Sequence, residues 1–243
     1  MWLQYGLLFA LFVGSFSISN YNDHTNDPIR FHHNFCESRL QNNEPPEIYN
    51  AFTSLVISTV PFIVGFPNYQ PFTNVAYYLI LNGFGSFYYH YYLTWLGKQA
   101  DEIPMILANY FALYGLIQLY YHKGKRKKYH VWNLLYMYGF FTINSVIRFD
   151  QYFAILFAIY LGPTIYYIRE IALRHKLPYI RYLAVSSFGA SCWIISEAYC
   201  NEYTVFGHVM WHIFFPLGFY QILMSYDDLY YKLRTYNLTH STG

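Results

Sequence analysis

Four polar residues in apolar surroundings are spaced so that they could do chemistry together. Ser86 and His90 are four residues apart, and so are His208 and His212. Side chains at this spacing lie on one face of a helix, so each pair can point toward a common centre. Asp101, at the start of a further apolar stretch, supplies a carboxylate.

The three histidines predict a metal site. Three neutral imidazoles suit zinc, because a catalytic zinc commonly keeps three protein ligands and leaves its fourth position for water. A carboxylate such as Asp101 can take a proton from water and pass it to a leaving group. A single buried histidine more often hydrogen-bonds a neighbouring helix, so the metal interpretation depends on all three histidines lying together.

Apolar segments must position these residues. The chain is 55% hydrophobic and 12% charged, against about a quarter charged in an average soluble domain. An apolar stretch of about 17–25 residues can cross a bilayer as a helix. Seven such stretches are present, near 50–67, 75–96, 103–121, 130–147, 152–168, 182–200 and 205–226. The predicted fold is therefore an all-α bundle of seven transmembrane helices.

The seven-span arrangement places the histidines at one depth. Alternate spans run in opposite directions, and a helix rises about 1.5 Å per residue. His90 near the end of the second span, and His208 and His212 near the start of the seventh, then lie about 5–10 Å below the same membrane boundary. Asp101 belongs to the same leaflet, so one site is expected at this end of the bundle.

The distribution of basic residues predicts the orientation of the bundle. Eleven of the 15 Lys and Arg residues fall in the segments 123–128, 169–181 and 232–234, which lie on one side of a seven-span bundle. Cytoplasmic loops carry an excess of positive charge. The C-terminus is therefore expected in the cytosol, and the site near the lumenal or extracellular leaflet. The basic run 123–128 could alternatively bind anionic lipid.

The segments outside the bundle have simpler interpretations. Residues 1–17 have the apolar middle of a signal peptide without its basic start, and they could instead form an extra apolar segment. We interpret residues 18–49 as a lumenal cap, 50–226 as the seven-helix membrane bundle and 227–243 as a cytosolic tail. Nothing in the chain indicates nucleic-acid binding, and no protein partner can be predicted.

Several short motifs together resemble those of the alkaline ceramidases, a family of seven-span membrane zinc hydrolases. The matching segments are Gly85–His90 (family pattern G-S-x-x-x-H), Asp101–Met105 (D-E-L-P-M), His208–His212 (H-x-W-W-H), Phe35–Glu37 (W-C-E) and Glu47–Asn50 (E-F-W-N). They occur in the family's order, from about residue 34 to residue 220. Each motif is short, but the set is specific.

The resemblance implies a function for these residues. His90, His208 and His212 would bind zinc, Asp101 would transfer protons, and Ser86 would stabilise the oxyanion. The implied reaction is hydrolysis of the N-acyl amide bond of ceramide, a membrane lipid, to sphingosine and fatty acid. The resemblance also implies a disulfide between Cys36 and Cys200 and a location in the ER or Golgi membrane.

The chain departs from the family pattern in the cap. The family binds calcium there through D-W-C-E-x-N and a downstream Glu, which correspond to a segment with Asn34, Phe35, Glu37 and Arg39, followed by Glu47. A guanidinium at the Asn position repels a cation, so calcium binding is doubtful. We expect Arg39 to replace part of the ion's role by bridging Glu37 and Glu47.

A second departure lies near the end of the sixth span. Ser196 stands where the resemblance predicts Asp, and the adjacent Glu197 is the acid that could compensate. Neighbouring residues on a helix differ in direction by about 100°.

Two other functions fit the same features. One is a related membrane hydrolase with another lipid substrate, because zinc-activated water attacks esters and amides alike. The other is a non-catalytic seven-span receptor that binds lipid. A receptor would have no need of Asp101 or Ser86. If substitution of both residues had no effect on function, the receptor would therefore be favoured over the hydrolases.

Overall fold

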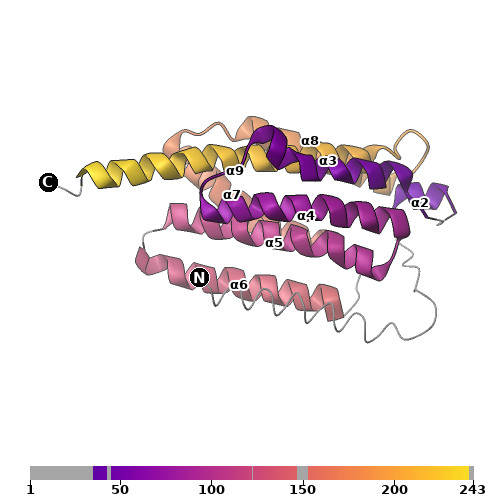
Figure 1. The fold of residues 1–243 in the computed structure, drawn as a ribbon, viewed down its shortest axis with the longest axis horizontal. Coiled ribbons are helices and arrows are strands. Elements are labelled where there is room, and N and C mark those ends of the chain that lie inside the picture. Colours follow the sequence, from indigo (N-terminus) through magenta and orange to yellow (C-terminus); the bar gives the residue numbers. More distant parts are fainter. Residues whose placement is uncertain (1–34, 43–44, 122, 147–152, 241–243) are drawn as a thin grey trace.

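A computed structural model describes residues 35–42, 45–121, 123–146 and 153–240, and in these ranges every regular element is a helix (Figure 1). The prediction of an all-α fold is therefore confirmed. Within the described residues, a short helix precedes seven long ones. The helices are α2 (Cys36–Leu40), α3 (Ile48–Val64), α4 (Gln70–Tyr92), α5 (Trp95–Tyr120), α6 (Lys123–Val146), α7 (Phe153–His175), α8 (Ile180–Ala198) and α9 (Gly207–His240).

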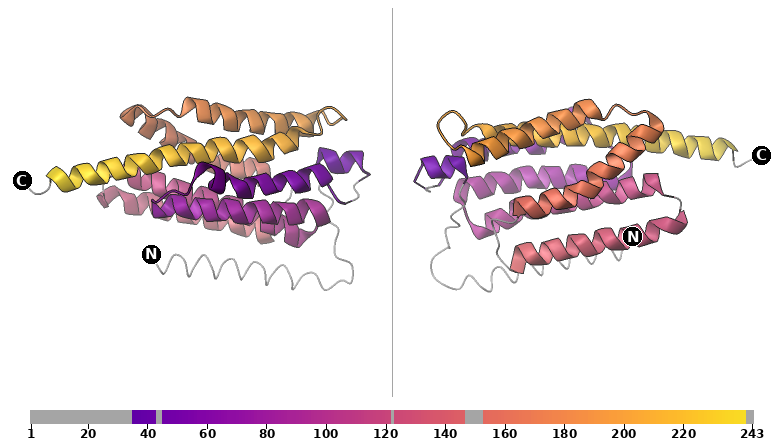
Figure 2. Two further views of the ribbon diagram at one scale, coloured as in Figure 1. Left: turned by 45° about the horizontal axis from the view of Figure 1, so that its top comes forward. Right: turned by 180° about the vertical axis from the view of Figure 1, so that it is seen from behind.

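Each long helix overlaps one of the apolar stretches marked in the sequence, and the long helices run back and forth along the molecule (Figure 2). α3 packs against α4 and α9, α4 packs against α5, and α8 packs against α9. α6 and α7 both contact α5. This arrangement brings the end of α4, the start of α5 and the start of α9 to the end of the bundle that carries α2.

Two of the described helices are long and apolar enough by themselves to cross a membrane. They are α5, with a mean hydropathy of 1.3, and α7, with 1.2. α3 is apolar too, but it has only 17 residues. The segment 1–17, which the sequence suggests as a signal peptide or extra apolar segment, lies outside the described residues.

Local signals place the boundary between α4 and α5 beside the predicted site. α4 ends at Tyr92, and the next residue, Leu93, adopts a left-handed conformation with φ of 48°, as the residue after many helices does. α5 begins at once, because the side chain of Thr94 accepts a hydrogen bond from the Gly97 amide. As a result His90 lies in the last turn of α4, and Asp101 lies in the second turn of α5.

The last helix is longer than the seventh predicted span. α9 continues to His240, so the predicted cytosolic tail from residue 227 begins inside a helix. Asp227 is buried, and its carboxylate accepts hydrogen bonds from the amides of Asn68 (3.2 Å) and Tyr69 (2.6 Å) at the start of α4. The first residue of the predicted tail is thus part of the packed bundle.

Candidate active site

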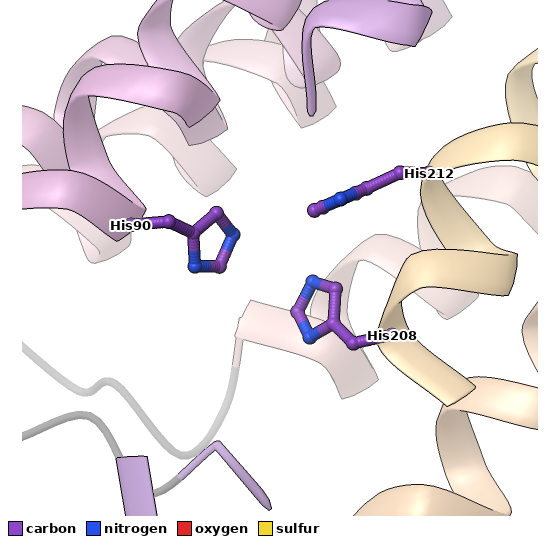
Figure 3. A group of neighbouring side chains, drawn as sticks. All are labelled: His90, His208 and His212. Carbon is purple, nitrogen blue, oxygen red and sulfur yellow. The ribbon is translucent and has the colours of Figure 1, made fainter. Parts of the chain in front are cut away.

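The three histidines meet at one point between α4 and α9. His90 approaches from α4, and His208 and His212 approach from the first two turns of α9 (Figure 3). One potential ligand atom from each ring lies within 4.8 Å of the other two. The exposed fractions of the side chains are 0%, 5% and 2%. Residues more than 100 positions apart in sequence therefore form one buried cluster.

His90 is oriented by a carboxylate. Its Nδ1 lies 2.5 Å from Oε2 of Glu47, and its carbonyl accepts a hydrogen bond of 2.9 Å from the Glu47 amide. The Nε2 atom of the same ring is buried without a hydrogen-bond partner in the structure. An imidazole held by a carboxylate on one nitrogen and open on the other is typical of metal ligands.

His212 is held in a similar way by hydroxyl groups. Its Nδ1 lies 3.1 Å from Oγ1 of Thr53 and 3.5 Å from Oγ of Ser54, both on α3. The Thr53 hydroxyl donates to the carbonyl of Tyr49, so its oxygen can accept a hydrogen bond from Nδ1 of the ring. The Nε2 atom then keeps its lone pair, as a metal ligand requires. The residues of the cluster therefore fit a metal ion, and the nitrogen-only donor set suits zinc.

Asp101 lies beside the histidines and is held by α4. Its Oδ1 accepts a hydrogen bond of 2.7 Å from the side chain of Asn82, and the Ser86 hydroxyl also donates to its carboxylate. Ser54 in turn donates to Ser86 over 2.9 Å. The Ser86 hydroxyl is thus engaged by both Ser54 and Asp101, so it would have to turn from Asp101 to donate to an oxyanion.

A second carboxylate near the site is neutralised. Glu102 forms an ion pair of 2.9 Å with Lys98, and it accepts a hydrogen bond of 2.8 Å from Asn144. Lys98 is fully buried and also lies over the ring of Trp95. Because Glu102 is held by a fixed cation, Asp101 is the better candidate for proton transfer.

A small cavity of about 90 Å³ lies beside the predicted site residues. Its wall includes Ser86, Asp101, His208 and His212 but not His90, together with apolar side chains from the cap and from α3, α4, α5, α7, α8 and α9. The apolar members are Phe35, Ile57, Tyr89, Met105, Phe153, Ala154, Trp193 and Trp211. A few polar groups converging in an apolar cavity are the usual form of a small-molecule site.

The cap covers this cavity. Phe35 packs edge-on against His208, with 4.4 Å between the ring centroids, and it also contacts His90. Cys36 forms a disulfide with Cys200, which ties α2 to the segment after α8, as the family resemblance predicts. The described part of the cap is therefore held across the entrance to the histidine cluster.

The prediction that Arg39 bridges Glu37 and Glu47 is wrong, because Arg39 pairs with Glu197. Its Nη2 lies 3.1 Å from Oε2 of Glu197 and donates to the Glu197 carbonyl over 2.9 Å. Arg39 does not bridge Glu37 and Glu47, because residues two apart on a helix such as α2 point in nearly opposite directions. Glu197, noted in the sequence only as a neighbour of Ser196, therefore anchors α2 to α8.

The two cap acids are engaged with protein groups. Glu37 accepts hydrogen bonds from the amides of Tyr49 (2.8 Å) and Asn50 (2.9 Å), so it caps the start of α3. Glu47 accepts hydrogen bonds from Ser38 and Asn50 besides its contact with His90. Burial raises the pKa of Glu37, and it raises the pKa of Glu47 to about 7. Asn34 lies outside the described residues.

Sequence reasoning missed two of these roles. Glu47 was assigned to the doubtful calcium site, although it contacts His90 directly. Asn82, which holds Asp101, lies four residues before Ser86 and eight before His90. This spacing puts Asn82 on the same helix face as Ser86 and His90. The spacing is the sequence signal from which its place at the site could be predicted.

Three buried histidines beside a carboxylate, in a cavity at one end of a helical bundle, have the donor groups and the general base of a metal-dependent hydrolase. Comparison with known proteins narrows this class. The model of the family described as Ceramidase matches residues 28–241, and the chain therefore belongs to the Ceramidase family.

A relative supports the same assignment. A protein of Dictyostelium discoideum described as "Putative alkaline ceramidase" is 25% identical to this chain, over 72% of the chain and 77% of its own length. The predicted family is thus confirmed, and the chain is a ceramide-hydrolysing enzyme.

Proposed function

We propose that this enzyme hydrolyses the N-acyl amide bond of ceramide, with zinc, to release sphingosine and a fatty acid. The observation that carries the proposal is the buried cluster of His90, His208 and His212, two of which line one cavity with Asp101. The donor set suits zinc because all three ligands are imidazole nitrogens, and the adjacent carboxylate supplies the general base that amide hydrolysis needs.

The proposed roles follow from the contacts of each residue. The three histidines would hold the zinc, which when bound would polarise the amide carbonyl and acidify water. Asp101, oriented by Asn82, would take a proton from the attacking water and deliver it to the leaving amine nitrogen. Ser86 would donate a hydrogen bond to the oxyanion after turning from Asp101. Addition of water and cleavage of the C–N bond then give the amine and the acid.

We further propose that all seven long helices cross a membrane. Many large apolar side chains on the outside of the bundle are exposed, for example Phe62 (68%), Ile63 (76%) and Ile194 (59%). A surface of this kind suits lipid rather than water. The basic segments then face the cytosol, and the site lies near the lumenal or extracellular leaflet of an ER or Golgi membrane.

In this proposal the cap is a structural part of the enzyme and zinc is its metal. The carboxylates of Glu37 and Glu47 accept hydrogen bonds from other groups of the protein. Arg39, a cation, lies on the short helix α2 together with Glu37. These contacts argue against calcium as a cofactor.

The test is sphingosine release from a panel of ceramides by the purified enzyme in detergent, measured by mass spectrometry together with zinc content. We expect His212→Ala to lose both zinc and activity. Asp101→Asn should keep zinc and lose activity by about 100-fold or more, because general-base catalysis contributes about that factor. Asp228→Asn, which changes an exposed acid on α9, is the matched control and should leave both quantities unchanged.

Three outcomes would contradict the proposal. A zinc-loaded protein that cleaves no ceramide in the panel would point to another lipid substrate. Full activity in Asp101→Asn would remove Asp101 from the mechanism. Retention of zinc without hydrolysis of any lipid amide or ester would favour a receptor.

A further inference from the structure

A second and larger cavity lies between α5, α6 and α7. It is a groove of about 560 Å³, within the range of about 300–1,000 Å³ that is usual for small-molecule sites. Its lining residues are Leu113, Ile117, Tyr129, Trp132, Asn133, Leu135, Tyr136, Tyr160, Pro163 and Tyr167. They share no member with the cavity at the histidine cluster, so this groove is a separate feature.

The groove and the histidine cluster lie in different parts of the bundle. The groove uses the second half of α5, the first half and middle of α6 and the middle of α7, whereas the histidine cluster lies at the start of α9 and the end of α4. In the proposed membrane orientation the groove therefore extends from the middle of the bundle toward its cytosolic end. Trp132 and Leu135 line the groove and are exposed, so it opens on the outer, lipid-facing surface.

The interior of the groove suits a hydrocarbon chain. Its surface is dominated by aliphatic and aromatic side chains, and two of its polar residues, Asn133 and Tyr160, are hydrogen-bonded to other groups of the protein. The Tyr160 hydroxyl donates to Asn133 over 2.7 Å, and Asn133 donates to the carbonyl of Tyr110 over 3.1 Å. These polar groups are already used, so the groove favours an apolar occupant.

Three tyrosines contact one another at the end of the groove nearest the start of α6, which we call its mouth. Tyr121 stacks on Tyr129 with 4.2 Å between the ring centroids, and its hydroxyl is hydrogen-bonded to that of Tyr167 over 3.1 Å. Tyr129 and Tyr167 both line the groove. Arg126 donates from Nε to the Tyr121 carbonyl over 2.6 Å, so its guanidinium is fixed beside this mouth.

Basic residues of two helices lie near the mouth. On α6, Lys125, Lys127 and Lys128 are exposed next to Arg126. On α7, the guanidinium of Arg174 lies 4.4 Å from the ring centroid of Tyr120. The nearby acid on α7, Glu170, is paired with Arg169. An apolar groove that opens at a cationic rim is complementary to a molecule with an apolar tail and an anionic head.

We propose that this groove binds an anionic membrane phospholipid, with an acyl chain between α5, α6 and α7 and its head group against the basic residues at the start of α6. The site is not the catalytic one, and the lipid is not the substrate. The inference goes beyond the proposed hydrolysis and rests only on the proposed membrane location of the bundle.

The test is native mass spectrometry of the purified protein with phosphatidylserine or phosphatidylcholine of identical acyl chains. Phosphatidylserine should bind more tightly. The double variant Arg126→Gln/Lys128→Gln should weaken it by about fivefold for each charge removed, because a basic residue at an anionic membrane surface contributes about that factor. The same variant should leave phosphatidylcholine binding unchanged.

A second pair of variants tests the groove itself. Leu135→Trp would fill the groove and should weaken phosphatidylserine binding. Val131→Trp adds the same side chain to an exposed position of α6 outside the groove lining, and should not. Glycerophosphoserine, which carries the head group without tails, should not displace the lipid.

Three results would overturn the proposal. Equal binding of the two lipids would remove the charge selectivity. An equal effect of Lys176→Gln, an exposed cation beyond the end of α7, would reduce the basic residues to a general surface charge. An equal effect of Val131→Trp would mean that lipid binds only around the bundle, without using the groove.

Discussion

Glu47 links the cap to the proposed metal site through hydrogen bonds of its carboxylate. Its carboxylate contacts Nδ1 of His90, and it accepts hydrogen bonds from Ser38 on α2 and Asn50 on α3. It is fully buried, and burial raises its pKa to about 7. A carboxylate in this position fixes the orientation of the ring and increases the basicity of the nitrogen that faces the metal.

Replacement of Glu47 should therefore weaken metal binding. We expect Glu47→Gln to lower zinc affinity by about 10–100-fold, the usual effect of losing such a partner, measured by competition with a chromogenic chelator. Glu202→Gln, which changes an exposed acid in the loop between α8 and α9, should leave the affinity unchanged. Unchanged zinc affinity in Glu47→Gln would show that the contact with His90 does not orient the ligand.

At the scale of elements, the crossing of α4 and α5 brings Ser86 next to Asp101. The crossing is close because Gly85 has no side chain. A Cβ atom added at Gly85 would lie 2.0 Å from the carbonyl oxygen of Ala100, and helix backbone cannot move aside as a flexible side chain can. The glycine therefore sets the distance between the two helices at the site.

Gly85→Ala should destabilise the protein and reduce its activity. Overpacking usually costs about 1–3 kcal/mol, so the melting temperature should fall, and the displacement of α5 should move Asp101 away from the histidines. Gly139→Ala on α6 is the matched control, because nothing lies within 4 Å of the added Cβ. Alanine favours the helix there, so its melting temperature should be equal or higher. Equal behaviour of the two variants would contradict this packing argument.

At the scale of the whole molecule, the covering of the site depends on contacts between distant parts of the chain. The disulfide joins Cys36 to Cys200, and Arg39 and Glu197 join the same two regions by an ion pair. The ion pair is partly exposed, and such pairs contribute about 0–1 kcal/mol. The disulfide contributes more, about 2–4 kcal/mol for a typical bridge, so it is the main fixture of the cap.

The double variant Cys36→Ser/Cys200→Ser should release the cap. We expect a lower melting temperature and faster loss of zinc to a chelator, because Phe35 would no longer be held over His208 and His90. Cys192→Ser removes the free cysteine on α8 and serves as the control. A double variant with wild-type zinc release would show that the helical bundle alone closes the site.

The sequence alone is enough to predict the all-α class, the approximate position of each long helix and the three histidines as site residues. These features depend on local properties, namely the length of apolar stretches and the spacing of residues along a helix. The Cys36–Cys200 pairing was available through the resemblance of short motifs to a family. The same motifs led to the family that the comparison confirms.

Only the folded structure shows which partners these residues have. Arg39 forms an ion pair with Glu197 and does not bridge Glu37 and Glu47, and the carboxylate of Glu47 contacts the ring of His90. The structure also shows the groove between α5, α6 and α7, near the basic segment 123–128. Such contacts join residues far apart in the chain, and they depend on how helices cross and rotate about their axes. Local spacing does not specify either quantity, because helices of one sequence pattern can pack at several angles.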